Sequence, residues 1–306
     1  MSKFSDFTGK DQKKKRNWFA AAAGAPSKET EQQKRLGSPF GITIDSHNRI
    51  FVADWMAGGV VVFDSETHKV DIWGAATGLP LRMPIGVAVD DQGRLFVSDS
   101  ALHVIYCVSR EGKLLAQFGQ AQLQKPTGLA IDKNRSLLYV TDVAAHRVAI
   151  FNLQNFELVK TIGGPGPGSQ PGQFRSPLAL SVDRRGFLYV VDTFNHRIQI
   201  FDRLWRFVSA FGTQGDGPGM FSRPKGIAVD SEGHIYVADA EFNNFQIFDA
   251  KGRVLMFVGT QGVRPGQFTL LAGLCIDEQD RVYTTEQRVN PRVQIFQYLS
   301  QPESKN

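Results

Sequence analysis

The sequence predicts an all-β fold, a six-bladed β-propeller of four-stranded antiparallel blades, with the last blade closed by the N-terminal segment. Three observations lead to this prediction. One unit recurs six times along the chain, each copy holds short apolar runs separated by turn residues, and the sixth copy stops after its third run. Internal repeats of 20 to 50 residues are typical of stacked or radial architectures.

The repeating unit is clearest in residues 226–259, and two acidic positions mark every copy. The copies follow one another at intervals of 42 to 51 residues. The first acidic position reads Asp45, Asp90, Asp132, Asp183, Asp230 and Asp277. The second reads Asp54, Asp99, Asp142, Asp192, Asp239 and Glu286.

The strands of one copy are predicted from runs rich in Val, Ile, Phe and Tyr. In the fifth copy they are GIAV (226–229), IYVA (235–238), FQIF (245–248) and VLMFV (254–258), with turn residues between them. This pattern predicts a four-stranded antiparallel meander. Strands this short cannot bury a face alone, whereas six such sheets packed radially cover both faces of every blade.

The two ends of the chain are predicted to meet in the last blade. The sixth copy ends with RVQIFQY (292–298) and lacks a fourth strand, which would leave an unpaired edge. Residues 17–24, which include Trp18 and Phe19, are expected to supply it. Because Ala20–Ala23 are good helix formers, a helical turn is the alternative. The predicted organisation is a basic arm (1–36), the propeller (37–299) and a disordered tail (300–306).

Charge is unevenly distributed along the chain. Residues 1–36 hold nine Lys and Arg against four Asp and Glu, and the other 270 residues hold 26 of each sign. The basic arm could contact phosphates or a membrane surface, although such arms are most often only solvated. A neutral body argues against nucleic acid as the partner, because binding to phosphates needs several clustered cations.

The chain shows neither a membrane-spanning run nor a disulfide framework. No apolar run reaches the length that crosses a bilayer, and the start of the chain lacks the apolar core of a secretory signal. The two cysteines, Cys107 and Cys275, lie in apolar strand runs and are expected to be buried, free thiols.

The repeated acidic residues are predicted to be structural. An Asp at the end of a strand accepts backbone N–H bonds from the turn that follows it. A role repeated in every blade fits such capping, whereas a functional site would break the symmetry. In two copies an Arg follows in the same turn, and we expect Arg147 to pair with Asp142 and Arg197 with Asp192.

The differences between copies point to a partner-binding face. In a propeller, the loop into the first strand and the loop between the second and third strands share one face, the top face. Apolar and basic residues on these loops are the predicted partner-binding residues: Trp55, Met56, Leu102, Val143, Phe194, Phe242, Lys225 and Arg288. Clustered apolar loop tips are typical of interaction surfaces, although each could instead pack against a neighbouring blade.

The repeats resemble the NHL family. The motifs that show the resemblance are Phe221–Asp230, then IYVAD, NHRIQIFD at 195–202 and a closing AFG at 210–212. The resemblance covers residues 37–298. It implies a six-bladed propeller but no single function, since members bind RNA, bind proteins, act as sensors or act as enzymes. The chain is especially similar to bacterial members that are exported, which implies a periplasmic or extracellular location if a leader has been removed.

The enzymes within this resemblance, the peptidyl-α-hydroxyglycine lyases, bind zinc through His ahead of the first strand. The corresponding residues are Phe40, Ile85, Thr127, Leu178, Lys225 and Ala272, none of which is His. His103, His146 and His196 are the alternative metal ligands, for zinc or calcium. Equivalent positions on neighbouring blades are expected to lie on the order of 10 Å apart, whereas a zinc ion needs each ligand nitrogen at about 2.0–2.1 Å from itself. This spacing argues against a shared metal ion.

The sequence therefore favours a non-catalytic interaction scaffold that binds a protein or peptide on its top face, as a monomer and with no resident cofactor. A metal-dependent lyase or hydrolase is the first alternative, and stoichiometric metal would favour it. RNA binding through the top face is the second, with basic candidates at Lys225, Arg288, Arg223, Lys125 and Arg82. Steep salt dependence would distinguish RNA binding from apolar docking.

Overall fold

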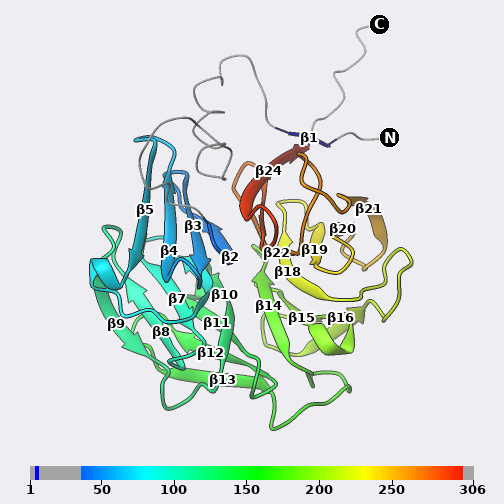
Figure 1. Cartoon of the computed structure of the whole chain (residues 1–306). Helices are drawn as coiled ribbons and strands as arrows, with labels where there is room; N and C mark the ends of the chain where they lie inside the picture. The colour runs from blue at the N-terminus through cyan, green and yellow to red at the C-terminus, as the bar shows by residue number, and fades with distance from the viewer. Residues whose placement is uncertain (1–3, 7–35, 299–306) are drawn as a thin grey trace, which may run out of the picture.

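The computed structural model describes residues 4–6 and 36–298 as six four-stranded antiparallel sheets arranged as the blades of a ring (Figure 1). Inner strands of successive blades contact each other all the way round, and β2 of the first blade contacts β22 of the last. The predicted all-β, six-bladed propeller is thereby confirmed. No helix of the described part is long and apolar enough to span a membrane.

The strands follow one another outward in each blade. Blades one to three are β2 (Pro39–Ile44), β3 (Arg49–Asp54), β4 (Gly59–Asp64), β5 (Lys69–Gly74); β6 (Pro84–Val89), β7 (Leu95–Asp99), β8 (Val104–Val108), β9 (Leu114–Phe118); and β10 (Pro126–Asp132), β11 (Leu137–Asp142), β12 (Arg147–Asn152), β13 (Leu158–Gly163). Blades four and five are β14 (Pro177–Val182), β15 (Leu188–Asp192), β16 (Arg197–Phe201), β17 (Phe207–Phe211); and β18 (Pro224–Val229), β19 (Ile235–Asp239), β20 (Asn244–Phe248), β21 (Val254–Val258).

The sixth blade takes three strands from its own repeat, β22 (Leu271–Ile276), β23 (Val282–Glu286) and β24 (Arg292–Tyr298). Strand β1 (Phe4–Asp6) pairs antiparallel with β24, with Phe4 opposite Tyr298. The N-terminal segment thus contributes the outer strand of this sheet, as expected for closure of the ring. The predicted closing segment, residues 17–24, lies outside the described residues.

The core lies between the blades, because each blade buries both of its faces against its neighbours. Phe174, Phe221 and Phe268, which precede blades four, five and six, are fully buried, and Leu occupies the equivalent place ahead of blades one to three. The Phe of the repeat motif therefore fills the space between adjacent sheets. Cys107 is buried in one of these clusters, Cys275 is half-buried, and both thiols are free.

Neighbouring inner strands touch at the third residue of each inner strand, which is Gly in five blades and Ala179 in blade four. A Cβ on Gly86 would lie 2.1 Å from the Thr127 carbonyl oxygen, and one on Gly273 would lie 2.1 Å from the Phe40 carbonyl oxygen. Each first strand also carries a register shift next to this point. In those five blades Gly is thus required by close backbone approach around the channel.

Candidate binding face and central channel

The top face consists of the leading loops, which precede the first strand of each blade, and the middle loops, which join the second and third strands. Asp99, at the end of β7, holds both the leading loop and the middle loop of blade two. Its Oδ2 accepts N–H bonds from Arg82 and Met83 at 2.6 and 3.0 Å, and its Oδ1 accepts from Ala101 and Leu102 at 3.0 Å each. The capping role predicted for the second acidic position is confirmed.

The expected Arg partners are also present. Arg147 lies 3.2 Å from the Asp142 carboxylate, and Arg197 lies 2.9 Å from that of Asp192. In the last blade Glu286 takes the Asp position and pairs with Arg292. These carboxylates are all buried, so they fix the top-face loops rather than offering themselves to a ligand.

The first acidic position caps the turns of the opposite, bottom face. Asp45 accepts N–H bonds from His47 and Arg49 at 2.9 Å, and its other oxygen pairs with the Arg49 side chain at 2.7 Å. His234 takes the place of the Arg beside Asp230. This set is structural as well.

The predicted apolar residues divide into two groups. Trp55, Met56 and Phe194 are exposed, with 43%, 63% and 58% of their surface accessible. Leu102, Val143 and Phe242 are half-buried, and Leu102 packs against the core between blades one and two. The second group thus follows the alternative given above, in which a loop residue packs against the protein instead of facing a partner.

Three more exposed apolar residues, which were not predicted from the sequence, lie on the top face. Val289, in the middle loop of blade six, is 81% exposed and has a φ of 62°, a left-handed conformation that costs a β-branched residue energy. Met220 and Val263 are exposed on the leading loops of blades five and six. In the sequence, only the length and Gly content of those two loops indicated that their residues could be exposed.

A Gln side chain on the third strand of the blade, buried in blades four and five and half-buried in blade six, holds each of these long leading loops in place. Gln246 accepts the Gly219 N–H at 2.9 Å and donates to the Met220 carbonyl at 2.8 Å. Gln199 does the same for the loop ahead of blade four and Gln294 for the loop ahead of blade six. The Gly-Pro-rich stretches are therefore fixed parts of the top face, on blades four to six.

Two of the three candidate histidines bond to the next blade, whereas Nδ1 of His196 is buried with no hydrogen-bond partner among the described residues. His103, His146 and His196 all adopt a left-handed backbone, with φ between 52° and 61°. His146 Nδ1 accepts the Ser176 N–H of the next blade at 3.0 Å, and His103 Nδ1 bonds to the Gln124 carbonyl. No group of three or more His, Cys, Asp or Glu that could hold a metal occurs among residues 4–6 and 36–298.

Of the predicted basic residues, Arg82, Lys125, Arg223 and Arg288 are exposed on the top face, where Arg175 joins them. Lys225 differs because it is only 5% exposed. It extends from β18 in blade five across blade six: its Nζ donates to Gln287 Oε1 at 2.8 Å and lies 5.5 Å from the centroid of the Phe40 ring in blade one. Three blades thus meet at its ammonium group.

The environment of Lys225 disfavours its charged form. Burial, the largest cause, and the positive charges of Arg223 and Arg288 together lower the pKa of its ammonium group from 10.5 to about 8. The sequence could not show this, because the residue after Pro224 reads as an ordinary loop position.

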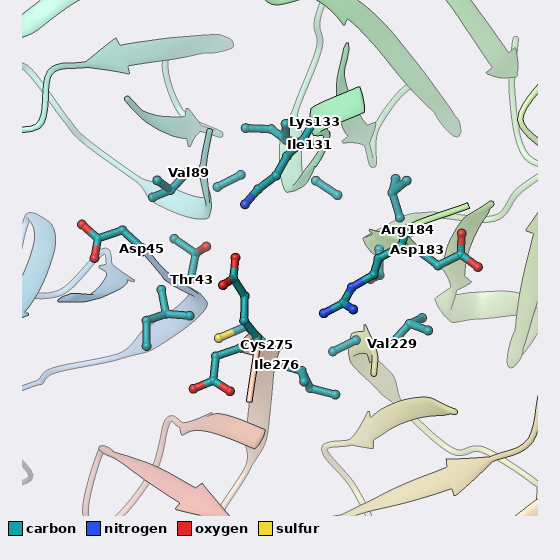
Figure 2. A pocket seen from close by; sticks show the side chains of 18 of the residues that line it. Thr43, Asp45, Val89, Ile131, Lys133, Asp183, Arg184, Val229, Cys275 and Ile276 are labelled. Carbon is teal, nitrogen blue, oxygen red and sulfur yellow. The ribbon is translucent and has the colours of Figure 1, made fainter. Parts of the chain in front are cut away.

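A cavity of about 600 Å³ occupies the bottom end of the central channel, lined by the ends of all six inner strands and the turns that follow them. Figure 2 shows the side chains of Lys133 and Arg184 pointing into it, while Asp45 points away. Lys133 pairs with Asp91 at 3.0 Å. These residues follow the first Asp of blades three and four, where other copies carry Ser or an acid, so the break in symmetry was readable from the sequence.

Comparisons with known proteins agree with this architecture. The NHL repeat family model matches residues 174–201 and 221–248. A probable peptidyl-alpha-hydroxyglycine alpha-amidating lyase of Caenorhabditis elegans is 34% identical over 100 residues, which are 32% of this chain and 28% of that protein. NHL repeat-containing protein 2 of Bos taurus is 33% identical over 99 residues, 30% of this chain and 14% of that protein.

Among solved structures, an auxiliary nutrient binding protein of Bacteroides thetaiotaomicron has the same fold, with a TM-score of 0.67 and 17% identity over 87% of this chain and 70% of that one. The alignments cover less than a third of either sequence relative. The positions at which the lyase resemblance implies His hold Phe40, Ile85, Thr127, Leu178, Lys225 and Ala272, so these residues do not fit a zinc ion. Repeats, relatives and fold together identify the chain as a six-bladed β-propeller of the NHL-repeat type.

Proposed function

We propose that the chain is a non-catalytic interaction scaffold that binds a protein or peptide on its top face. The observation that carries this proposal is the exposure of Trp55, Met56 and Phe194 on middle loops that are held in place. The buried Asp54 carboxylate accepts the N–H groups of Met56 and Ala57, and the Phe194 N–H donates to the Arg175 carbonyl. Exposed aromatic side chains on a fixed frame lose little freedom on binding, which is what an interaction hot spot requires.

The frame supports this function in a second way. The long leading loops of blades four to six stand on the same face, and each is fixed by a Gln side chain. The top face therefore keeps its shape without a ligand, so a partner would meet a preformed surface rather than one that must be ordered.

A peptide library displayed on phage and selected against the immobilised protein tests the proposal. Enriched peptides are synthesised, and their affinities are measured by fluorescence anisotropy for the wild type and for Trp55→Ser and Phe194→Ser. Removing an aromatic hot spot costs about 2 kcal/mol, so each variant should bind about 30-fold more weakly.

Phe257→Ser is the matched control, because Phe257 is as exposed as Phe194, at 61%, but lies on the outer strand β21. It should leave the affinities unchanged. Selection of no peptide, or of peptides whose binding responds to Phe257→Ser and not to Phe194→Ser, would contradict docking on the top face.

A further inference from the structure

The ammonium group of Lys225 is buried without a counter-charge. Its hydrogen-bond acceptor, Gln287 Oε1, is neutral, and no carboxylate within the described residues lies at ion-pair distance from it. The charged groups that act on it are the guanidinium groups of Arg223 and Arg288, which carry the same sign. An ion held away from water without an opposite charge is costly, and an anion beside it removes that cost.

The two Arg residues stand on the solvent side of this group. Arg223 is exposed on the leading loop of blade five, and Arg288 is exposed in the middle loop of blade six, next to Gln287. That middle loop carries the left-handed Val289, a costly conformation of the kind that concentrates at ligand sites. A buried cation thus forms the floor of a site, and two exposed cations form its rim.

We propose that the top end of the central channel is a carboxylate-binding site, with Lys225 as its floor and Arg223 and Arg288 as its rim. This deepens the proposed scaffold function, because it names the group that a docked peptide would present. One carboxylate oxygen accepts from Lys225 Nζ in place of Gln287 Oε1, and the other accepts from a guanidinium group of the rim.

A carboxylate of a peptide fits this face better than the phosphates of a nucleic acid. Residues 37–306 carry equal numbers of acidic and basic side chains, and exposed apolar residues such as Val289 stand beside the rim. Nucleic-acid binding gains its affinity from many phosphate contacts, whereas one buried ammonium with two guanidinium groups suits a single negative charge.

The test uses small probes on the whole chain and follows binding by NMR shifts of backbone amides. N-Acetylglutamate α-amide carries one side-chain carboxylate, N-acetylglycine carries a terminal one, and the methyl ester of the first carries none. Either acid should bind at millimolar concentration and the ester should not. Comparing the two acids shows whether an acidic side chain or a chain terminus is the natural source.

The variants assign the effect to the site. Lys225→Met should weaken binding of the acid at least about tenfold, the loss expected for one charge-assisted contact. Arg223→Gln with Arg288→Gln alters only exposed residues and should also weaken it severalfold, which keeps the test valid if Lys225→Met does not fold. Lys125→Gln, an exposed leading-loop residue of blade three, is the control and should have no effect.

Binding should also fall as the pH rises through the pKa of Lys225, about 8, because the ammonium group then loses its proton. Equal binding of the ester, or equal binding by the Lys225 and Arg variants, would overturn the proposal. So would Lys225-dependent binding of a uridine oligonucleotide that is tighter than that of either acid and steeply salt-dependent. A carboxylate effect that persists in Phe194→Ser while no displayed peptide is selected would refute the scaffold and leave the carboxylate site standing.

Discussion

Replacing Asp99 by Asn should be among the most damaging single-atom changes in this molecule. The carboxylate accepts four backbone N–H bonds, two on each oxygen, from a leading loop and a middle loop. An amide offers one oxygen, so whichever way it turns, two donors face its NH₂ group. At about 1.5–3 kcal/mol for each bond to a charged acceptor, the loss is about 4 kcal/mol.

That loss of free energy predicts a decrease in the melting temperature. The entropy of unfolding is about 2.1 cal/mol/K per residue, or about 0.55 kcal/mol/K for the roughly 260 residues of the propeller, so Asp99→Asn should lower the Tm by about 7 °C. Differential scanning calorimetry measures this, and hydrogen exchange should show faster exchange in both loops. Asp216→Asn, on an exposed loop, is the control. A Tm for Asp99→Asn within about 1 °C of the wild type would refute the reasoning.

Three further predictions follow from the packing. Gln246→Leu should release the leading loop of blade five, seen as new protease cleavage within 212–221, while the loop ahead of blade six stays protected. Gly273→Ala forces a Cβ to within 2.1 Å of a carbonyl oxygen and should cost about 1–3 kcal/mol in urea unfolding, unlike Gly217→Ala, whose Cβ would meet only the flexible Met220 side chain, at 3.4 Å. Burial raises the pKa of the Cys107 thiol to about 11, so iodoacetamide should label it only after denaturation, and rapid labelling of Cys107 itself in the native protein, located by peptide mass mapping, would contradict its burial.

Lys225 adds a pH dependence of known sign to this group of predictions. Its folded pKa of about 8 lies below the ordinary value of 10.5, so between these values the unfolded chain binds more protons and stability rises with pH. The gain across that window is up to about 3 kcal/mol. Lys225→Met should abolish the rise, and denaturant unfolding at a series of pH values would show it; an unchanged slope would count against the burial of the charge.

Much of the fold could be predicted because the propeller repeats its local rules. Each copy shows the same strand runs and the same two acids, so the six-bladed ring and the carboxylate caps follow from one unit read six times. Asp142 and Asp192 could even be assigned their Arg partners. Repetition turns weak local signals into a strong one.

The site was less readable because it depends on how blades meet. Phe194 and Phe242 occupy equivalent loops, yet the first is exposed and the second half-buried. Lys225 follows a Pro in a loop-like context, and only the curvature of the ring places its side chain beside Phe40, far away in the sequence. Contacts across the axis leave no periodic trace in the sequence.

The seam between the first and last blades has a consequence for how the chain reaches its native state. Thr285 Oγ1 donates to the Phe40 carbonyl at 2.7 Å, across 245 residues of sequence. During synthesis the first blade emerges long before this partner exists, so its inner strand stays uncovered on one side until the last repeat leaves the ribosome. Non-local contacts of this kind form slowly and leave apolar surface open to aggregation. The completed ring is therefore a late product, and chains that stop within the sixth repeat should be the ones that chaperones and proteases retain.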